Sequence, residues 1–533
     1  MRTGFLHTLK QFDRWSFALM VFAIAYGCVL SMNLSKSSMQ WDEVTHFTGG
    51  LLLSRGQLGL WVSSNSLYPP IYDIFVAIYY ITIGPSIFAA RLVAVTFSVL
   101  SLFVIFVIAR KLYDKRTALI SAFLFSVMPG IIWISRLAMI ETMLIFTFSV
   151  SMLFFFSWLQ TDRERDRIIA FATLVVGVAV KYQVLVVVPI IMLLGMFFWK
   201  RAYLKAQLKS CLRLPRVAIV AVAIAVTAIA VYELSASGLL SLLLFTLREG
   251  TAQKAFYSQQ YPMPIFYLVE MTWFNNVVQP ISLILYVIAL AGVGLMLFRR
   301  KREDKFLLLW LSVVYIVFTL IPNKDWRYVS IAFPVLAISA STFLVASFDR
   351  LRNIWHVAGK SLTKMWGSKF LAGLLIILVA IGVFYSCVNA YNWEAKNSFQ
   401  VPVEQSTYYA AQNLTQNQSL AVAFSTNSFN IYMVWYYMYM KNPSQNYNQI
   451  WQYPVLAADA YSPDFNISQF ISLCQQNNAK YILLYEFGDQ QYFNSSISEQ
   501  EVISSLNQSA QFTLQATFGN QPNRILVFSF SPN

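Results

Sequence analysis

Two adjacent carboxylates, Asp42 and Glu43, stand in the stretch MQWDEVTHFTGG, just after the first long apolar run of the sequence. A third acid, Glu141, lies in SRLAMIETM, between two later apolar runs. An ionisable group at membrane depth costs about 2.5 to 3.5 kcal/mol to insert, and such groups usually mark a cavity or pathway. Any one of these acids can equally be a solvated residue at the end of a span. As a set, they are candidates for general bases.

Basic residues are expected on the same side of the membrane as these acids: Arg91, Arg136, Lys181, Lys324 and Arg327. Lys181 interrupts the apolar stretch LVVGVAVKYQVLVVVPI, where the plain alternative is a lysine that snorkels to the interface. Carboxylates that face cations suit a reaction in which an anionic lipid phosphate leaves and a hydroxyl attacks. The cations would hold the phosphate while a carboxylate takes the hydroxyl proton. This is the chemistry of a lipid-linked sugar donor.

The elements that position these residues are predicted to be membrane-spanning helices. The chain has 533 residues, of which 57% are hydrophobic and 12% charged, and its mean hydropathy is +0.55. A span takes about 20 apolar residues, which predicts about 11 spans. They fall near residues 15–34, 91–110, 117–135, 141–159, 168–182, 183–199, 216–236, 279–298, 305–322, 328–347 and 370–390.

The segment 67–84 begins with Pro69-Pro70, carries Asp73 and is predicted not to span. With that choice, every strongly basic loop falls on one side. These loops are 1–14, 110–116, 161–167, 200–216, 299–305 and 349–369. The positive-inside rule then predicts a multi-pass plasma-membrane protein with a cytoplasmic N-terminus. It also explains the net charge of +15, so no nucleic-acid partner is implied.

An odd number of spans places the tail outside, so we expect a transmembrane domain over 1–390 and an extracytoplasmic domain over 391–533. The tail is rich in Asn, Gln, Ser and Tyr and contains five N-glycosylation sequons, at Asn413, Asn417, Asn466, Asn494 and Asn507. The runs SLAVAFST, AKYILLYEF and RILVFSF are typical of strands, and ISQFISLCQQNN is typical of a helix. The tail is therefore predicted to be an α/β domain.

Six motifs resemble, in order, those of the GT-C membrane glycosyltransferases: WDEVTHF, YPPIYDIF, AARLVAVTFSVLS, SRLAMIETMLIF, GVAVKYQVLVVVP and RYVSIAFPVLA. The resemblance covers about residues 10–350. The branch it indicates holds the dolichyl-phosphate-mannose protein mannosyltransferases and the aminoarabinose lipid A transferase. It implies a GT-C-type α-helical polytopic fold and an inverting enzyme that takes a sugar from a polyprenyl phosphate at the outer leaflet.

The resemblance also implies roles for particular residues. Asp42 matches the first-loop acid of the family, Glu43 is its partner, and Glu141 matches the second-loop acid, which is more often Asp. Lys181 and Arg327 fall in family motifs and are candidates for binding the donor phosphate, together with Tyr328 and Arg136. The long outer loop 237–278 suits a mobile segment over donor or acceptor, or a plain connector. Its candidate contacts are Lys254, Tyr257 and Tyr261.

The chain departs from the aminoarabinose transferase at Leu67 and Tyr68, where that enzyme has an acidic and a basic residue before its Pro-Pro pair. The WWD motif of oligosaccharyltransferases does not occur in the sequence, which favours transfer of a single sugar. The acceptor hydroxyl can belong to a protein, a lipid or a glycan. The dispersed acids do not specify a metal site, although some branches of the family use a divalent metal. The rival interpretations are a secondary transporter with buried acids and a non-catalytic scaffold of the same fold.

Overall fold

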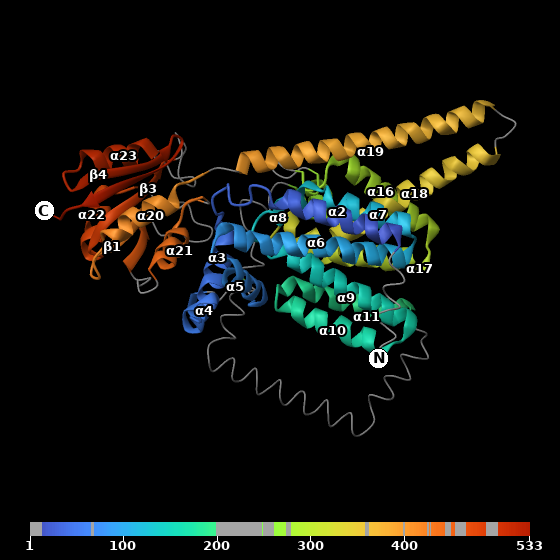
Figure 1. Ribbon diagram of the computed structural model, residues 1–533, viewed down its shortest axis with the longest axis horizontal. Helices are drawn as coiled ribbons and strands as arrows, with labels where there is room; N and C mark the ends of the chain where they lie inside the picture. The colour runs from blue at the N-terminus through green and yellow to red at the C-terminus, as the bar shows by residue number, and fades with distance from the viewer. Residues whose placement is uncertain are drawn as a thin grey trace, which may run out of the picture.

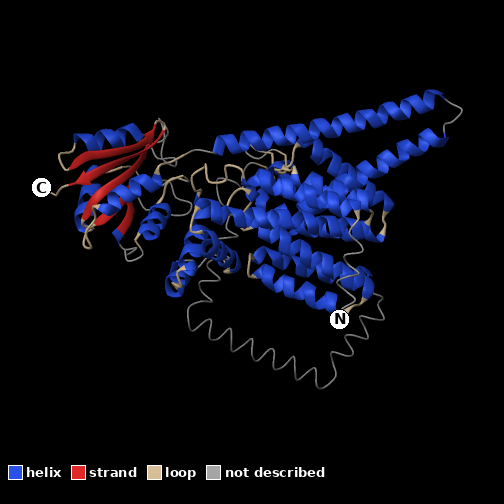
Figure 2. Cartoon of the chain, viewed as in Figure 1, coloured by secondary structure: helices blue, strands red, loops and turns tan. Residues whose placement is uncertain are grey.

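The computed structural model describes residues 13–64, 69–198, 248, 261–272, 279–357, 362–397, 400–423, 426, 428–442, 449–453, 465–486 and 499–532. Helices form most of this part of the chain, and the strands gather at one end of the molecule (Figure 2). The helices α3, α4 and α5 lie between the main helical body and the region that holds the sheet (Figure 1).

The secondary-structure elements described in the N-terminal half are all helices. Its elements are α2 (Arg14–Ser31), α3 (Trp41–Ser54), α4 (Leu58–Ser64), α5 (Ile71–Ile83), α6 (Ile87–Leu112), α7 (Lys115–Ser126), α8 (Pro129–Ser135), α9 (Glu141–Thr161), α10 (Glu164–Val178), the 3-10 helix η1 (Tyr182–Val186) and α11 (Val187–Phe198). The central elements that follow are η2 (Met263–Ile265), α15 (Phe266–Glu270), α16 (Leu283–Arg299), α17 (Arg302–Leu320), η3 (Trp326–Ala332), α18 (Phe333–Val357) and α19 (Leu362–Asn397).

Polar side chains fix where several of these helices begin. The side chains of Asp13, Ser86 and Asp114 accept backbone N–H groups in the first turns of α2, α6 and α7, respectively. Such caps satisfy donors that have no partner within the helix, typically worth about 1 kcal/mol each. Helix contacts are close: a Cβ on Gly292 of α16 would stand 2.0 Å from the carbonyl oxygen of Ser339 in α18. The glycine therefore permits the approach of these two helices.

Five of the described helices are long and apolar enough to cross a membrane, namely α2, α6, α9, the helix from Trp326 to Trp355 and the helix from Trp366 to Ala395. A sixth span arises if α7 and α8, which are bent by 66° at their junction, are counted as one. Shorter apolar helices are Ile71–Ile83, Tyr182–Leu194 and Leu283–Arg299. The chain is thus a membrane protein with several apolar helices. The figure of about 11 spans stays a prediction, since segment 216–236 falls outside the described residues.

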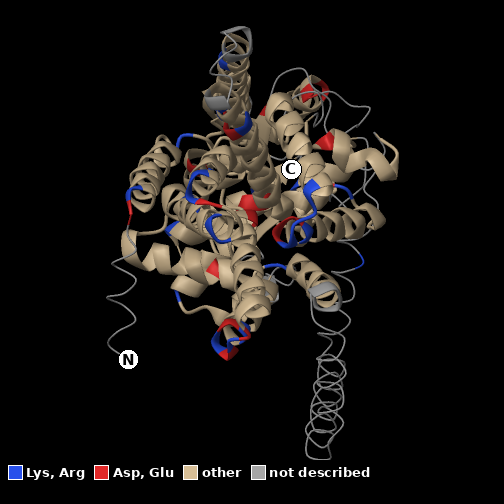
Figure 3. Ribbon diagram, turned by 90° about the vertical axis from the view of Figure 1, so that its right-hand side faces the viewer, with Lys and Arg blue, Asp and Glu red and all other residues tan. Residues whose placement is uncertain are grey.

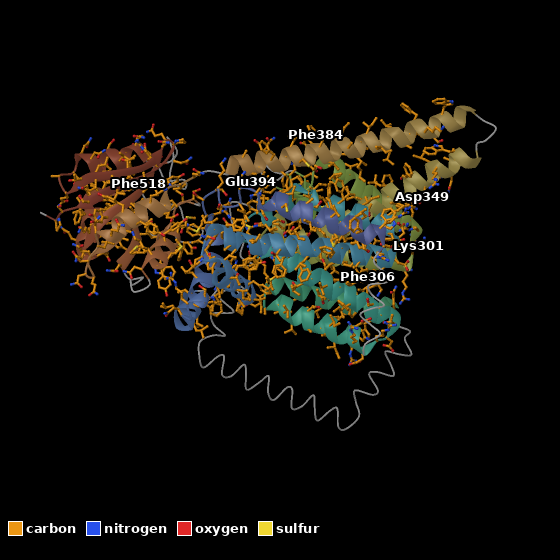
Figure 4. The ribbon with its side chains drawn as sticks, viewed as in Figure 1. Lys301, Phe306, Asp349, Phe384, Glu394 and Phe518 are labelled. Atoms are coloured by element: carbon orange, nitrogen blue, oxygen red, sulfur yellow. The ribbon has the colours of Figure 1, made fainter. Side chains whose placement is uncertain are left out.

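Charged residues of four predicted inner loops, 1–14, 110–116, 299–305 and 349–369, lie at the end of the helical body away from the sheet. Figure 4 places Lys301 and Asp349 at that end and Glu394 near the opposite end. Figure 3 looks onto this end of the molecule and shows basic and acidic segments there in blue and red. Asp349 binds Arg116, with N–O distances of 2.9 Å, and Asp13 binds Lys115 at 2.6 Å. The described parts of the predicted inner loops 1–14, 110–116 and 349–369 therefore meet at one end of the helical body. Which side this is stays a prediction.

The C-terminal region contains a five-stranded sheet in the order β2-β1-β3-β5-β4. Strands β2, β1 and β3 are parallel, and β5 runs antiparallel to both β3 and β4. The elements are α20 (Val403–Gln412), β1 (Ser419–Ala423), α21 (Ile431–Lys441), β2 (Ile450–Tyr453), α22 (Ile467–Gln476), β3 (Ala479–Glu486), α23 (Glu499–Gln508), β4 (Phe512–Asn520) and β5 (Asn523–Phe530).

The two faces of this sheet pack into different cores. On one face, Ile482 and Leu484 of β3 join Phe470 of α22 and Val502 of α23 in a separate cluster. On the other face, side chains of β1, β3 and β5 join those of α20, α21 and the helical body in one continuous core. The sheet region is therefore packed onto the helices and not merely linked to them by the chain.

Helix α21 makes the contact with α3. The guanidinium of Arg55 donates to the carbonyl oxygens of Tyr439, at 2.5 Å, and Met440, at 2.9 Å, near the C-terminal end of α21. The ring of Tyr436 lies edge-on to Phe47, with 5.7 Å between the centroids. A guanidinium at a helix C-terminus satisfies free carbonyls and opposes the helix dipole favourably. These contacts hold the middle and the C-terminal end of α3 against the sheet region.

Candidate active site

Glu43 is held in a buried ion pair. It lies in the first turn of α3, is fully buried, and binds Arg91 of α6 through two hydrogen bonds of 2.8 and 2.7 Å. Its carboxylate also accepts the backbone N–H groups of Ala138, at 2.7 Å, and of Gln40, at 3.0 Å. Arg91 itself donates to the backbone oxygens of Leu34, Ser37 and Ser38. Glu43 therefore links α3 to α6, to the residue that precedes α3 and to the segment that follows α8.

Asp42, the adjacent residue, has a different environment. Its side chain is 43% exposed, and its Oδ2 lies 2.6 Å from Nη1 of Arg327, at the start of η3. The opposite edge of the Arg327 guanidinium binds Asp325, with Nε and Nη2 at 2.8 and 2.7 Å. Asp325 also caps η3, because it accepts the backbone N–H of Arg327 at 2.8 Å. The start of η3 therefore fixes the direction in which Arg327 points.

A second acid–cation pair stands beside the first. Glu141, at the start of α9, is 4% exposed, and its Oε1 lies 2.9 Å from Nζ of Lys181. Lys181 Nζ also lies 5.8 Å from the ring centre of Tyr328, the residue that follows Arg327. Glu141 interacts electrostatically with Arg327 as well. The two pairs thus meet at η3, and Asp42, Glu141, Lys181, Arg327 and Tyr328 form one cluster drawn from four separate parts of the chain.

Arg136, another predicted phosphate ligand, contacts other groups. Its Nη1 donates to the carbonyl oxygens of Leu30, at 2.7 Å, and Met32, at 2.9 Å, and its Nη2 lies 3.1 Å from Glu394 of α19. Nearby, Trp133 stacks on Trp393, with 4.8 Å between the ring centroids. Arg136 therefore joins the ends of α2, α8 and α19. Its two Nη atoms are engaged at these helix ends and not by the residues of the cluster around η3.

The candidate loop residues are only partly placed. Lys254 and Tyr257 lie outside the described residues. Tyr261 is partly buried against Phe266, at 6.3 Å between ring centroids, just before α15. This ring contact does not involve the cluster around η3, and the role of Tyr261 as a donor or acceptor contact stays a prediction.

Several polar residues with buried contacts do not stand out in the sequence. Asp325 is the second partner of Arg327, and an Asp before a short helix is a common cap that signals this kind of role. A buried pair lies at the base of α3 and α5, where His46 Nδ1 is 2.7 Å from Asp73 Oδ1. The indole of Trp61 donates to the other carboxylate oxygen of Asp73, at 3.0 Å. These contacts join α3, α4 and α5, and no spacing in the sequence predicts them.

Glu270 and Lys324 are two buried charged residues near Asp325. Glu270, at the end of α15, is 2% exposed, and its Oε2 is buried with no hydrogen-bond partner in the described part of the chain. Burial, followed by the negative charge of Asp325, raises the pKa of Glu270 to about 8. Lys324 is 1% exposed and donates to the carbonyl oxygens of Phe318, Thr319 and Ile321 at the end of α17. Burial lowers the pKa of Lys324 to about 8.

The arrangement can bind an anion and accept a proton in one place. Arg327 and Lys181 supply charged donors suited to a phosphate, and the partly exposed Asp42 supplies a carboxylate that is accessible to a hydroxyl group. Within the described ranges, no three His, Cys, Asp or Glu side chains group as metal ligands would.

Comparison with known proteins gives a match to one family model and several matches to solved structures. The family model for dolichyl-phosphate-mannose-protein mannosyltransferase matches residues 68–232. No curated protein sequence matches the chain. Among solved structures, ArnT from Cupriavidus metallidurans in the apo state matches with a TM-score of 0.60 at 12% identity, covering 97% of this chain and 100% of that one. The same protein bound to undecaprenyl phosphate gives a TM-score of 0.55 at 13% identity, covering 97% and 99% of the two chains.

An oligosaccharyltransferase from Archaeoglobus fulgidus, tethered to an acceptor peptide, matches with a TM-score of 0.54 at 14% identity. The match covers 89% of this chain and 69% of that one. Because these identities are low, the structural matches establish the fold alone. Together with the family model, they confirm the resemblance to the GT-C membrane glycosyltransferases.

Proposed function

We propose that this protein is an inverting glycosyltransferase that moves one sugar from a polyprenyl-phosphate donor to a hydroxyl group at the outer membrane face. The observation that carries the proposal is the pairing of Asp42 with Arg327 beside the pairing of Glu141 with Lys181. Two kinds of comparison support it: the match to a family described by a lipid-phosphate-linked sugar, and the similarity in fold to an ArnT that binds undecaprenyl phosphate.

The reaction uses the cluster as follows. Arg327 and Lys181 hold the donor phosphate, and Tyr328 lines the space beside Lys181. The acceptor oxygen attacks the anomeric carbon from the face opposite the phosphate and forms the new glycosidic bond. The bond between that carbon and the phosphate oxygen breaks, and its electron pair leaves with the polyprenyl phosphate, whose growing charge the two cations stabilise. Asp42 takes the proton of the acceptor hydroxyl.

The other predicted residues take supporting roles in this proposal. Glu141 holds Lys181 in place at the cluster. Glu43, whose carboxylate oxygens are all engaged inside the protein, positions α3 and does not react. We further propose that the region after residue 390 lies outside the membrane on the same side as the cluster, with α21 fixed to the helix that carries Asp42.

The test uses membranes that carry the wild type or Asp42→Asn, a panel of radiolabelled polyprenyl-phosphate sugars, and total cell-envelope acceptors. We expect the wild type to transfer one sugar and the variant to lose about 10²- to 10⁴-fold of the rate, which is the usual contribution of a general base. The matched control is Asp349→Asn, because Asp349 also sits in a partly exposed pair with an arginine. Equal transfer by the wild type and Asp42→Asn would remove Asp42 from the mechanism, and transfer from no donor would favour a transporter or a scaffold.

A further inference from the structure

The guanidinium of Arg327 is shared between two carboxylates that differ in how firmly they are held. Asp325 is 5% exposed and binds the Nε and Nη2 edge from within the same helical turn. Asp42 is 43% exposed and binds only Nη1, from a helix 285 residues away in sequence. The Asp325 contact is local and buried, so it persists when other parts of the site move. The Asp42 contact can be exchanged for another anion.

In the structure, Oδ2 of Asp42 accepts a hydrogen bond from Nη1 of Arg327 at 2.6 Å, so each group occupies the other. A phosphate is the alternative partner for the same donor, because guanidinium N–H groups match phosphate oxygens in geometry and charge. In the structure described, the carboxylate of Asp42 stands where an oxygen of a bound phosphate would make its contact with Nη1.

The charges of the cluster argue against the phosphate being added without an exchange. Three carboxylates, those of Asp42, Asp325 and Glu141, face two cations, those of Arg327 and Lys181. A phosphate that entered with Asp42 still on Nη1 would place two anions against one donor, and like charges at such a distance repel. Departure of Asp42 from Arg327 relieves this repulsion.

We propose that the donor phosphate replaces Asp42 on Nη1 of Arg327, and that this exchange frees Asp42 to act as the base. The inference rests on the proposed function and adds an order to it: the donor binds first, and its phosphate releases Oδ2 of Asp42 for the acceptor hydroxyl. Without donor, Oδ2 of Asp42 is held 2.6 Å from Nη1 of Arg327. The same side chain thus serves as a competitor of the phosphate and then as its catalytic partner.

This model makes an unusual prediction for donor binding. If Asp42 competes with the phosphate, Asp42→Asn removes the competing charge and tightens phosphate binding, while it abolishes transfer. The pair is partly exposed, so the gain is modest, about fivefold in Kd. Asp325→Asn has the opposite effect, because Arg327 loses the partner that orients it. A residue that merely supports the fold would not tighten binding when it is changed.

The experiment measures the Kd of undecaprenyl phosphate for the full chain, purified and placed in lipid nanodiscs. It compares the wild type, Asp42→Asn, Asp42→Ala, Asp325→Asn and the distant control Asp349→Asn, with folding checked by thermal unfolding. We expect tighter binding for both Asp42 variants, weaker binding for Asp325→Asn, and an unchanged Kd for Asp349→Asn. If the wild type binds and the Asp42 variants bind equally or more weakly, the exchange is wrong while the proposed function stands. If neither the wild type nor any variant binds the lipid, the proposed function is wrong, and this inference is then wrong as well.

Discussion

Asp42 and Glu43 are neighbours in the first turn of α3, yet they belong to two different regions of the molecule. Glu43 points into the interior, where it is fully buried and receives two guanidinium N–H groups and two backbone N–H groups. Asp42 is partly exposed and shares one donor of Arg327. Side chains one residue apart on a helix point about 100° apart, so adjacent acids can serve separate purposes.

The different environments of Asp42 and Glu43 indicate which carboxylates can take part in a reaction. A carboxylate whose oxygens are all engaged by fixed donors cannot accept a proton without breaking the fold around it. A carboxylate that is partly exposed and paired with a cation that can bind another anion is free to exchange partners. Burial and the number of donors therefore separate the supporting acid from the reacting acid, and three predictions probe that separation.

The largest effect is expected for Arg91→Met. The substitution leaves the buried charge of Glu43 unpaired and frees the backbone oxygens that Arg91 binds, which should lower the free energy of unfolding by about 3–5 kcal/mol. Thermal unfolding of the purified protein would measure it. The control is Arg116→Met, which breaks the partly exposed pair with Asp349 and should cost at most about 1 kcal/mol. Equal losses in the two variants would contradict a supporting role for the Glu43–Arg91 pair.

An intermediate effect is expected for Lys181→Met in the background Glu141→Gln, which avoids leaving a buried charge behind. Loss of one phosphate-binding cation should reduce kcat/KM for the donor by about 10- to 100-fold, since a charged hydrogen bond is typically worth about 1.5–3 kcal/mol. Glu141→Gln alone should keep more of the donor affinity, because Lys181 remains. Lys480→Met, in β3, serves as the control for loss of a lysine. Full donor affinity in the double variant would exclude Lys181 from the phosphate site.

The smallest effect concerns pH. Glu270, with its pKa raised to about 8, is neutral at pH 7 and becomes charged above pH 8, which adds a negative charge beside Asp325 and weakens the hold of Arg327 on phosphate. We expect donor kcat/KM to fall by about fivefold or less as pH rises through 8, and Glu270→Gln to flatten this fall. The free energy of unfolding also falls as the pH rises. Glu270 keeps its proton up to about pH 8 in the folded state but loses it near pH 4.5 in the unfolded state, so the stability declines between about pH 4.5 and 8.

Lys324 titrates in the same range and provides the necessary control. Its pKa is lowered to about 8, so it loses its charge as Glu270 gains one. Lys324→Arg keeps the charge at all these pH values. If the alkaline fall disappears in Lys324→Arg and persists in Glu270→Gln, the lysine is the responsible group and the assignment to Glu270 is wrong.

The sequence predicted the main part of the cluster because charge is rare in its apolar surroundings. Asp42, Glu141, Lys181 and Arg327 each interrupt or border an apolar run, and the structure brings them together around η3. Their outer-face location and their roles in a reaction stay predictions. Apolar patterns also predicted several of the helices and three strands of the tail, for instance β3 at AKYILLYEF.

The sequence could not decide which cation serves which acid. The sequence predicts Arg91, Arg136 and Arg327 on the same side of the membrane as both acids, so each arginine is an equally good candidate partner. Only the packing of α2, α6 and α19 decides which pairs form. The buried pair of His46 and Asp73 depends on how α3 meets α5, which no local pattern records. Local chemistry therefore predicts membership of the cluster, whereas tertiary packing decides the partners within it.

The continuous core between the sheet and the helices has a consequence for how such a chain can change in evolution. Tyr436 of α21 contacts both Phe47 and Tyr80, so a break in the chain after α19 would expose apolar and aromatic surface on both halves. Recombination at the linker near residue 400 therefore cannot exchange the tail as an independent module. A replacement tail would need to carry its own match to α3, including carbonyl groups placed to receive Arg55.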